Sequence, residues 1–378
     1  MKNIIIFGFG EMGKKLTDEC LIYGTDFNIK AIADNNPKVS KYKNIPVIIP
    51  QLINKFVYDE IWVCTIYFED IMKQLSDEYG VKEDKMHFVE PVLPILEERL
   101  RKRYEIQMSN LELVSGELKT VLTYLKNNPL RMYCYSFYNE YLHKKPQVQF
   151  DAAKGLYYGI YNGKKMYFSG KLNTHQKAMA YFNAVTMEQD SRSPHCYWKN
   201  ENINHISGIG IDAGAAEGVF ALRIIEQIEH IYLVEADVQW VEALKYTFEP
   251  YQDRVTIIRK FVGIDDAGDN ARLDTLICSK KIDFMKLDIE GMELDALQGA
   301  EKILLDNRVQ LAVCVYHHQR DNELISQWLQ ERGYHLQNSY GLVVCQGDWE
   351  LEKDETDFRK ALLFADNYTG KVNEQYGK

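Results

Sequence analysis

Two glycines and two acids near the middle of the chain have the types and spacing to bind a charged ligand. Gly210, Asp212 and Gly214 alternate with apolar residues, and Glu235 ends the next apolar run. An acid would repel a phosphate, but it can face an ammonium group. Gly214 has no Cβ, so the backbone can approach a ligand, and Glu235 can accept hydrogen bonds from both ribose hydroxyls. These residue types favour S-adenosylmethionine (SAM) over a dinucleotide.

The residues around these four predict the elements that position them. Residues 209–212 and 231–234 are short apolar runs typical of buried strands, and residues 219–228 are apolar at helical spacing. A strand, a glycine turn, a helix and a strand form half of a nucleotide-binding sheet. A plain βαβ unit is the alternative, because Gly-rich turns are common. Further expected cofactor contacts are Ala215, Glu217, Ala236, Val262 and Asp288.

A second group of acids follows the apolar run 282–287. Asp288 and Glu290 are candidate catalytic residues, because ligands bind at the carboxyl ends of such strands. Lys286 is buried by pattern and must find a carboxylate among these acids; it is also a candidate substrate contact. Glu293 is better explained as a cap of the next helix.

Two histidines complete the candidate site. His317 follows the next apolar run, where it could act as the general base for an acceptor hydroxyl or contact the substrate. A histidine bonded to a loop carbonyl is the alternative. His195 lies in the polar segment 188–197, which is either a surface loop or a flap over the cofactor or acceptor. Carboxylates with a histidine could also hold a divalent cation, but no metal ligand is assigned.

The N-terminus carries a second nucleotide pattern. Gly8, Gly10 and Gly13 form G-x-G-x-x-G after a strand-like run, and Asp34 ends the next such run. This predicts a small Rossmann-like domain with NAD or another nucleotide as its candidate ligand. The pattern resembles the N-terminal domains of some bacterial sugar-nucleotide epimerases, dehydratases and acetyltransferases. The next segment offers no acid or base for hydride transfer, so a degenerate or regulatory site, or a docking domain, is the alternative.

Composition narrows the class of protein. The 378 residues carry a formal charge of −10, which argues against a general nucleic-acid binder. No apolar run is long enough to span a bilayer, and the N-terminus begins with a strand pattern rather than a signal peptide. The seven cysteines are scattered, without a Cys-x-x-Cys pair. They predict a reduced, cytoplasmic protein.

The pattern of elements predicts three regions. Residues 1–92 form the Rossmann-like α/β domain, residues 93–147 a helical linker, and residues 148–378 a second α/β domain. In the last region, helices alternate with apolar strands before a β-rich end. That order predicts a doubly wound parallel sheet with late antiparallel strands.

Several motifs in residues 150–365 together resemble the FkbM-type SAM-dependent methyltransferases. They are Asp212-Ala-Gly214, Glu235, Leu273-Asp274, Lys286-Leu-Asp288-Ile-Glu290-Gly291-Met-Glu293, Leu297-x-Gly299-Ala300 and Tyr316-His317. The resemblance implies a seven-stranded class I methyltransferase fold. It also implies O-methylation of hydroxyls on sugars, glycolipids or macrocyclic natural products.

The resulting hypothesis is an O-methyltransferase that acts on a carbohydrate or glycan precursor, as in polysaccharide biosynthesis. Its partner would be a small-molecule or glycan acceptor, and a homo-oligomer is left open. One alternative is an NAD-dependent sugar-nucleotide-modifying enzyme that uses the N-terminal motif. Another is a non-catalytic scaffold with two nucleotide-sensing domains.

Overall fold

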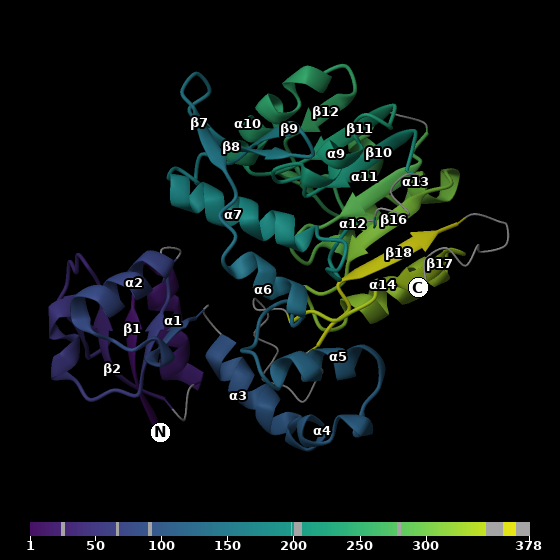
Figure 1. Cartoon of the computed structure of the whole chain (residues 1–378). Helices are drawn as coiled ribbons and strands as arrows, with labels where there is room; N and C mark the ends of the chain where they lie inside the picture. Colours follow the sequence, from purple (N-terminus) through teal and green to yellow (C-terminus); the bar gives the residue numbers. More distant parts are fainter. Residues whose placement is uncertain are drawn as a thin grey trace. The chain divides into compact units, whose positions relative to one another are not determined.

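The computed structural model describes residues 1–23, 27–65, 68–89, 93–197, 199, 206–277, 281–344 and 358–367. The chain divides into two compact units, Met1–Arg131 and Met132–Lys378 (Figure 1). The helical region 93–147 is therefore shared between the units, and its boundaries as a separate linker stay a prediction. Among the described residues, no helix is both long and apolar enough to cross a membrane.

The first unit is built on a six-stranded sheet with the order β3-β4-β2-β1-β5-β6, parallel except for the β3–β4 pair. The strands are β1 (Lys2–Phe7), β2 (Phe27–Ala33), β3 (Lys41–Tyr42), β4 (Ile45–Ile48), β5 (Glu60–Val63) and β6 (Met86–Phe88). The helices are α1 (Glu11–Tyr23), α2 (Phe68–Tyr79), α3 (Leu93–Arg103), α4 (Glu105–Ser109) and α5 (Gly116–Leu125). Short 3-10 turns are η1 (Pro50–Lys55), η2 (Glu83–Lys85) and η3 (Leu111–Leu113).

Alternation along β1 explains how this sheet is covered. Ile5 and Phe7 pack in a cluster with Leu75 of α2, whereas Ile4 and Ile6 pack in another cluster with Leu16 of α1. A strand buried on both faces needs apolar residues at successive positions, because neighbouring side chains point to opposite faces. The continuous Ile-Ile-Ile-Phe run therefore folds as a central strand.

The second unit contains a seven-stranded sheet with the order β12-β11-β10-β15-β16-β18-β17. Its strands are β10 (Ile209–Ala213), β11 (His230–Val234), β12 (Val255–Ile258), β15 (Phe284–Leu287), β16 (Gln310–Cys314), β17 (His335–Asn338) and β18 (Leu362–Asp366). All pairs are parallel except those made by β18. This is the predicted class I methyltransferase fold, with a late antiparallel strand.

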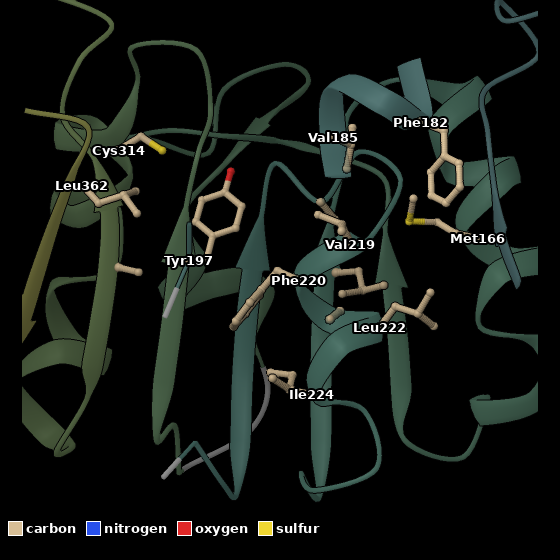
Figure 2. Close-up of a cluster of buried hydrophobic side chains, with 14 of the residues drawn as sticks. Met166, Phe182, Val185, Tyr197, Val219, Phe220, Leu222, Ile224, Cys314 and Leu362 are labelled. Carbon is tan, nitrogen blue, oxygen red and sulfur yellow. The ribbon is translucent and has the colours of Figure 1, made fainter. Parts of the chain in front are cut away.

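Helices cover both faces of this sheet. One core cluster joins α9 (Val219–Ile224), α10 (Val238–Thr247) and α7 (His175–Glu188) to the sheet. Figure 2 shows part of it, with Met166 and Phe182 at one end, Cys314 and Leu362 at the other, and Tyr197 between them. The other cluster includes residues of α11 (Leu273–Leu276), α12 (Glu293–Gly299), α13 (Glu301–Asp306) and α14 (Asp321–Gln330).

Smaller elements complete the second unit. They are α6 (Ser136–Leu142), the hairpin sheet β7 (Val148–Asp151), β8 (Leu156–Tyr161) and β9 (Lys164–Tyr167), the pair β13 (Phe261–Val262) and β14 (Asn270–Ala271), and the turn η4 (Glu249–Tyr251). The Asn162-Gly163 turn joins β8 to β9, and both residues have positive φ.

Two apolar runs of the second unit do not form single regular strands. The run 255–262 divides into β12 and β13, and the run 342–345 contributes only an isolated bridge from Val343 to Arg359 within the described part. Five cysteines are free and buried, and Cys278 and Cys345 lie outside the described residues.

Strand order locates the ligand-binding edge. The chain leaves β10 toward β11 on one side, and β15 pairs with β10 on the other side. Ligands of open α/β sheets bind at the carboxyl ends of the strands where the order reverses. Residues that follow β10 and β15 therefore define the candidate site.

Candidate active site

The turn after β10 is held close to the end of β15. Gly214 and Gly218 have φ values of +72° and +79°, which suit glycine. A Cβ on Gly214 would lie 1.8 Å from the carbonyl oxygen of Asp288. Glu235, after β11, accepts hydrogen bonds from the backbone N–H groups of Ala216 (2.9 Å) and Asp237 (2.8 Å). The turn and the two strand ends are thus positioned together, as a nucleoside site requires.

Asp212 and Lys286 form a buried ion pair beneath this turn. Lys286 Nζ lies 3.0 Å from Asp212 Oδ1 and donates a hydrogen bond of 2.6 Å to the Gly214 carbonyl oxygen. Burial raises the pKa of Asp212, although Lys286 opposes this shift. Burial alone would lower the pKa of Lys286, but the charges of Asp212 and Asp288 raise it.

This pair changes two sequence-based expectations. Lys286 pairs with Asp212, which precedes it by 74 positions, rather than with the acids that follow its own strand. Asp212 is 1% exposed and Lys286 is 3% exposed. Neither charge can therefore reach a ligand directly, and both are better described as residues that hold the Gly214 turn. The direct contact of Asp212 with an ammonium group and that of Lys286 with a substrate are not supported.

The other expected cofactor contacts differ in exposure. Ala215, Glu217 and Val262 are buried, whereas Ala236 is half-buried. The Tyr181 hydroxyl donates a hydrogen bond to Glu217, and burial raises the pKa of Glu217 to about 7. Their contacts with a cofactor stay predictions.

Asp288 is the centre of a cluster of polar side chains after β15. The Tyr197 hydroxyl donates a hydrogen bond to its Oδ2. His195 Nε2 lies 3.7 Å from the same oxygen, and His317 Nε2 lies 3.6 Å from Oδ1. Burial raises the pKa of Asp288, but Lys286, His195 and His317 outweigh it and lower the pKa to about 2. Asp288 is therefore ionised at neutral pH.

His317 lies between carboxylates at both ring nitrogens. Nδ1 is 3.1 Å from Glu293 Oε1, and Nε2 faces Asp288 and, at 3.8 Å, Glu290. Burial lowers the pKa of His317, but Glu293, Asp288 and Glu290 raise it to about 9. An imidazolium cannot accept a second proton, so the expected role of His317 as general base is not supported at neutral pH. Its charge instead keeps Asp288 ionised.

The two acids near His317 have different environments. Glu293 Oε1 accepts hydrogen bonds from the N–H groups of Ile289 (2.8 Å) and Gly291 (3.4 Å), so it binds the turn before α12. It is the first residue of α12 and does not cap the helix, whose N-cap is Met292. The Glu290 side chain is 94% exposed. Glu290 can therefore contact a substrate, whereas Glu293 holds the turn before α12 and pairs with His317.

His195 is not on a surface loop. It is fully buried, and its Nδ1 lies 3.4 Å from Glu188 Oε1. The sequence pattern did not identify Glu188, Tyr197 and Cys314 as neighbours of Asp288. The polar segment 188–197 contains the first two, and Cys314 lies in an apolar strand that carries no such signal.

Two sets of described side chains have ligand atoms close enough for a metal ion. They are His195, Asp288 and Cys314, and Asp288, Glu293 and His317. In the second set, His317 offers different nitrogens to its two carboxylates, so ion pairs explain the arrangement. Hydrogen bonds and ion pairs likewise account for the first set. We assign no metal ligand.

The N-terminal glycine turn folds onto its own acid. Gly8 has φ +110°, and a Cβ on Gly13 would lie 1.7 Å from the Gly8 carbonyl oxygen. Asp34 accepts hydrogen bonds of 2.8 Å from the N–H groups of Phe9 and Asn36. A dinucleotide site needs these turn amides for the pyrophosphate and the acid for the ribose. The described geometry therefore does not fit NAD.

Comparisons with known proteins identify parts of both units. A family model described as the Methyltransferase FkbM domain matches residues 268–336, and one described as C2185-like, N-terminal, matches residues 1–87. The first match includes Asp288 and His317, so the resemblance seen in the sequence is confirmed for this segment. No curated protein matches the chain.

Several solved structures are similar. The methyltransferase FkbM from Methylobacillus flagellatus KT is 15% identical, with a TM-score of 0.44 and coverage of 96% of this chain and 90% of that chain. Precorrin-6y C5,15-methyltransferase from Geobacter metallireducens GS-15 is 15% identical, with a TM-score of 0.28 and coverage of 43% and 80%. TrmK from M. capricolum, solved with S-adenosyl-homocysteine, is 10% identical, with a TM-score of 0.29 and coverage of 46% and 70%.

Proposed function

We propose that this SAM-dependent methyltransferase transfers the methyl group to a hydroxyl oxygen of a carbohydrate or glycan precursor. The observation that carries the proposal is the ionised Asp288 at the edge where strand order reverses, beside the Gly214 turn. A carboxylate there can orient a hydroxyl group and receive its proton.

The residues of the first two strand ends would hold SAM. Glu235 can accept hydrogen bonds from the ribose hydroxyls, because each of its oxygens keeps a free lone pair beside the backbone N–H that it already binds. Gly214 has no side chain, which allows its turn to lie against the Asp288 carbonyl group at the edge of the site. When bound, SAM supplies an electrophilic methyl group on a sulfonium. The protein contributes mainly by holding the acceptor oxygen in line with that methyl group.

The proton of the hydroxyl group can pass to Asp288 even though Asp288 is a weak base. As the acceptor oxygen gains the methyl group it becomes positively charged, and its proton becomes far more acidic than a carboxylic acid. A carboxylate with a pKa of about 2 can then accept it. His317 stabilises the ionised Asp288 before this step, since its own pKa of about 9 keeps it protonated.

The polar groups around Asp288 favour an acceptor with several hydroxyls. Glu290 is exposed beside His317, and Asp288 itself keeps 18% of its side chain exposed. Together these carboxylates offer acceptors to neighbouring hydroxyl groups, as a sugar presents them. The net charge of −10 disfavours a nucleic-acid acceptor.

The test is methyl transfer from ¹³C-methyl-labelled SAM by the purified full chain. The panel contains free sugars, nucleotide sugars and polyols, with phenols, amines and thiols for comparison. We expect label in a methyl ether of a sugar or polyol, identified by NMR. Glu235→Ala should lose activity, whereas Glu242→Ala, which changes an exposed acid on α10, should retain it. Label found only on nitrogen, sulfur or carbon would disprove the proposal.

A further inference from the structure

A line of buried polar side chains leads away from Asp288 on the side opposite His317. His195 Nε2 lies 3.7 Å from Asp288 Oδ2, and His195 Nδ1 lies 3.4 Å from Glu188 Oε1. The three residues come from the end of β15, from the turn after α7 and from the last residue of α7. The distances from the two His195 nitrogens to these carboxylate oxygens exceed hydrogen-bond length, but catalytic contacts of this kind often shorten when a substrate binds.

The two ends of this line differ in exposure. His195 is fully buried, whereas 29% of the Glu188 side chain is exposed. The Tyr133 hydroxyl donates a hydrogen bond of 2.8 Å to Glu188 Oε1, which keeps that oxygen directed at the histidine. Asp288 is therefore connected through His195 to a carboxylate that reaches solvent.

The groups around His195 hold its ring in place. Tyr197 and Tyr316 pack edge-to-face on it at centroid distances of 5.0 and 5.2 Å, and Cys314 Sγ lies 3.5 Å from Nε2. In the tautomer that carries its proton on Nδ1, the N–H group points to Glu188 and the lone pair of Nε2 faces Asp288. A neutral imidazole in this tautomer can accept a proton at Nε2 and release one at Nδ1.

The histidine on the other side of Asp288 offers no such path through its second ring nitrogen, although its Nε2 lies 3.8 Å from the exposed Glu290. His317 lies against Glu293, which is 1% exposed and already binds two backbone N–H groups. A proton passed in that direction would remain buried in the fold. A proton passed toward His195 reaches Glu188 and then water.

We propose that His195 and Glu188 carry the acceptor's proton from Asp288 to solvent after methyl transfer. This inference rests on the proposed function. The acceptor oxygen forms a bond to the methyl carbon, the carbon–sulfur bond breaks, and its electron pair stays on sulfur. The hydroxyl proton goes to Asp288 Oδ2 and then to His195 Nε2. His195 gives its Nδ1 proton to Glu188, which releases it to water, so each methyl transfer releases one proton. The ring is then protonated on Nε2, and it returns to the Nδ1–H tautomer before the next turnover.

The relay is tested with His195→Gln and His195→Ala in the full chain, on the hydroxyl acceptor found for the wild-type protein. His195→Gln should lower kcat by about 10²-fold, as for other acid–base groups, with the KM for SAM unchanged. Imidazole added to His195→Ala should restore turnover, and substituted imidazoles should restore it according to their pKa values. A residue that only supports the fold would show no such dependence. Glu242→Ala, which changes an exposed acid on α10, should behave as wild type.

Glu188→Gln provides a second measurement that leaves the buried histidine intact. We expect a lower kcat and a changed solvent isotope effect, because the last proton acceptor is removed. Wild-type turnover in both His195→Gln and Glu188→Gln, with methyl-ether product, would overturn the relay and leave the proposed function standing. If the wild-type chain forms no methyl ether with any hydroxyl acceptor, the proposed function fails and the relay fails with it.

Discussion

Replacing Lys286 with methionine should destabilise the second unit strongly while leaving the first unit unaffected. The ammonium group is 3% exposed and lies 3.0 Å from Asp212, which is 1% exposed. Methionine has similar length but no charge. The variant therefore leaves a carboxylate in the core without its partner, and it also removes the hydrogen bond to the Gly214 carbonyl oxygen.

The expected loss is about 3–5 kcal/mol of unfolding free energy, the range for breaking one partner of a buried pair. Most of this loss reflects the uncompensated charge rather than the attraction itself. The double variant Lys286→Met/Asp212→Asn removes both charges and should recover much of the stability. A surface pair provides the control: Arg320→Ala breaks an exposed pair with Glu323 and should cost at most about 1 kcal/mol.

The deficit of Lys286→Met should shrink as the pH falls. Burial already raises the pKa of Asp212 in the folded protein, and losing Lys286 raises it further. A folded state that binds more protons than the unfolded state loses stability as pH rises from the unfolded pKa, about 3.9 for Asp, to the folded pKa. The full deficit therefore appears above the folded pKa of Asp212.

The measurement is hydrogen exchange of β10 and β15 peptides during urea unfolding, with β1 and β2 peptides as an internal reference. This readout separates the two units, whose unfolding need not be one transition. Lys286→Met with wild-type protection of β10 at neutral pH would refute the reasoning. So would a double variant that is less stable than Lys286→Met.

Three further predictions concern the site and the N-terminal motif. The contribution of His317 to stability should be complete below pH about 6.5 and lost as pH rises through about 9, because the pKa of His317 is raised in the folded protein. Denaturation of wild type and His317→Gln across this pH range measures the contribution. A difference in unfolding free energy between the two proteins that grows above pH 9 would contradict the prediction. Glu235→Ala should weaken SAM binding by roughly 1.5–3 kcal/mol in calorimetry, and wild-type affinity in a folded variant would exclude the ribose contact. Gly10→Val should leave single-turnover methylation intact, since a complete SAM-type fold lies in the second unit. Loss of methylation while β10 is still protected from hydrogen exchange would show that the two units are functionally coupled.

Local pattern was enough for most of the strands, for the turns and for the sheet edge. The runs around Ile211 and Leu287 are apolar at successive positions because both faces of each strand are covered, and that requirement is visible within a few residues. Gly214 and Gly218 precede a helix where only a positive φ makes the turn. Asp288 and His317 could be placed at neighbouring strand ends because each follows an apolar run, and the carboxyl ends of parallel strands lie at one edge of the sheet.

Which groups pair there was decided by the tertiary structure. Asp212 lies directly opposite Lys286 in the β10–β15 register. The two residues are 74 positions apart in the sequence, and neither strand alone predicts how the two strands align. The protonation of His317 depends on burial and on three carboxylates of the segment 288–293, so its residue type alone suggested a base where the fold makes an acid. His195 looked like a loop residue because its burial comes from distant strands and helices.

The sequence by itself therefore determined the fold class, the sheet edge and the residue types present at the site, because these follow from short-range periodicity and turn chemistry. The tertiary structure alone decided the pairing of Lys286, the charge states of Asp288 and His317, and the use of the Phe9 amide by Asp34. Charge and hydrogen bonding depend on distances through space and on desolvation, and both are set only when separate segments pack together.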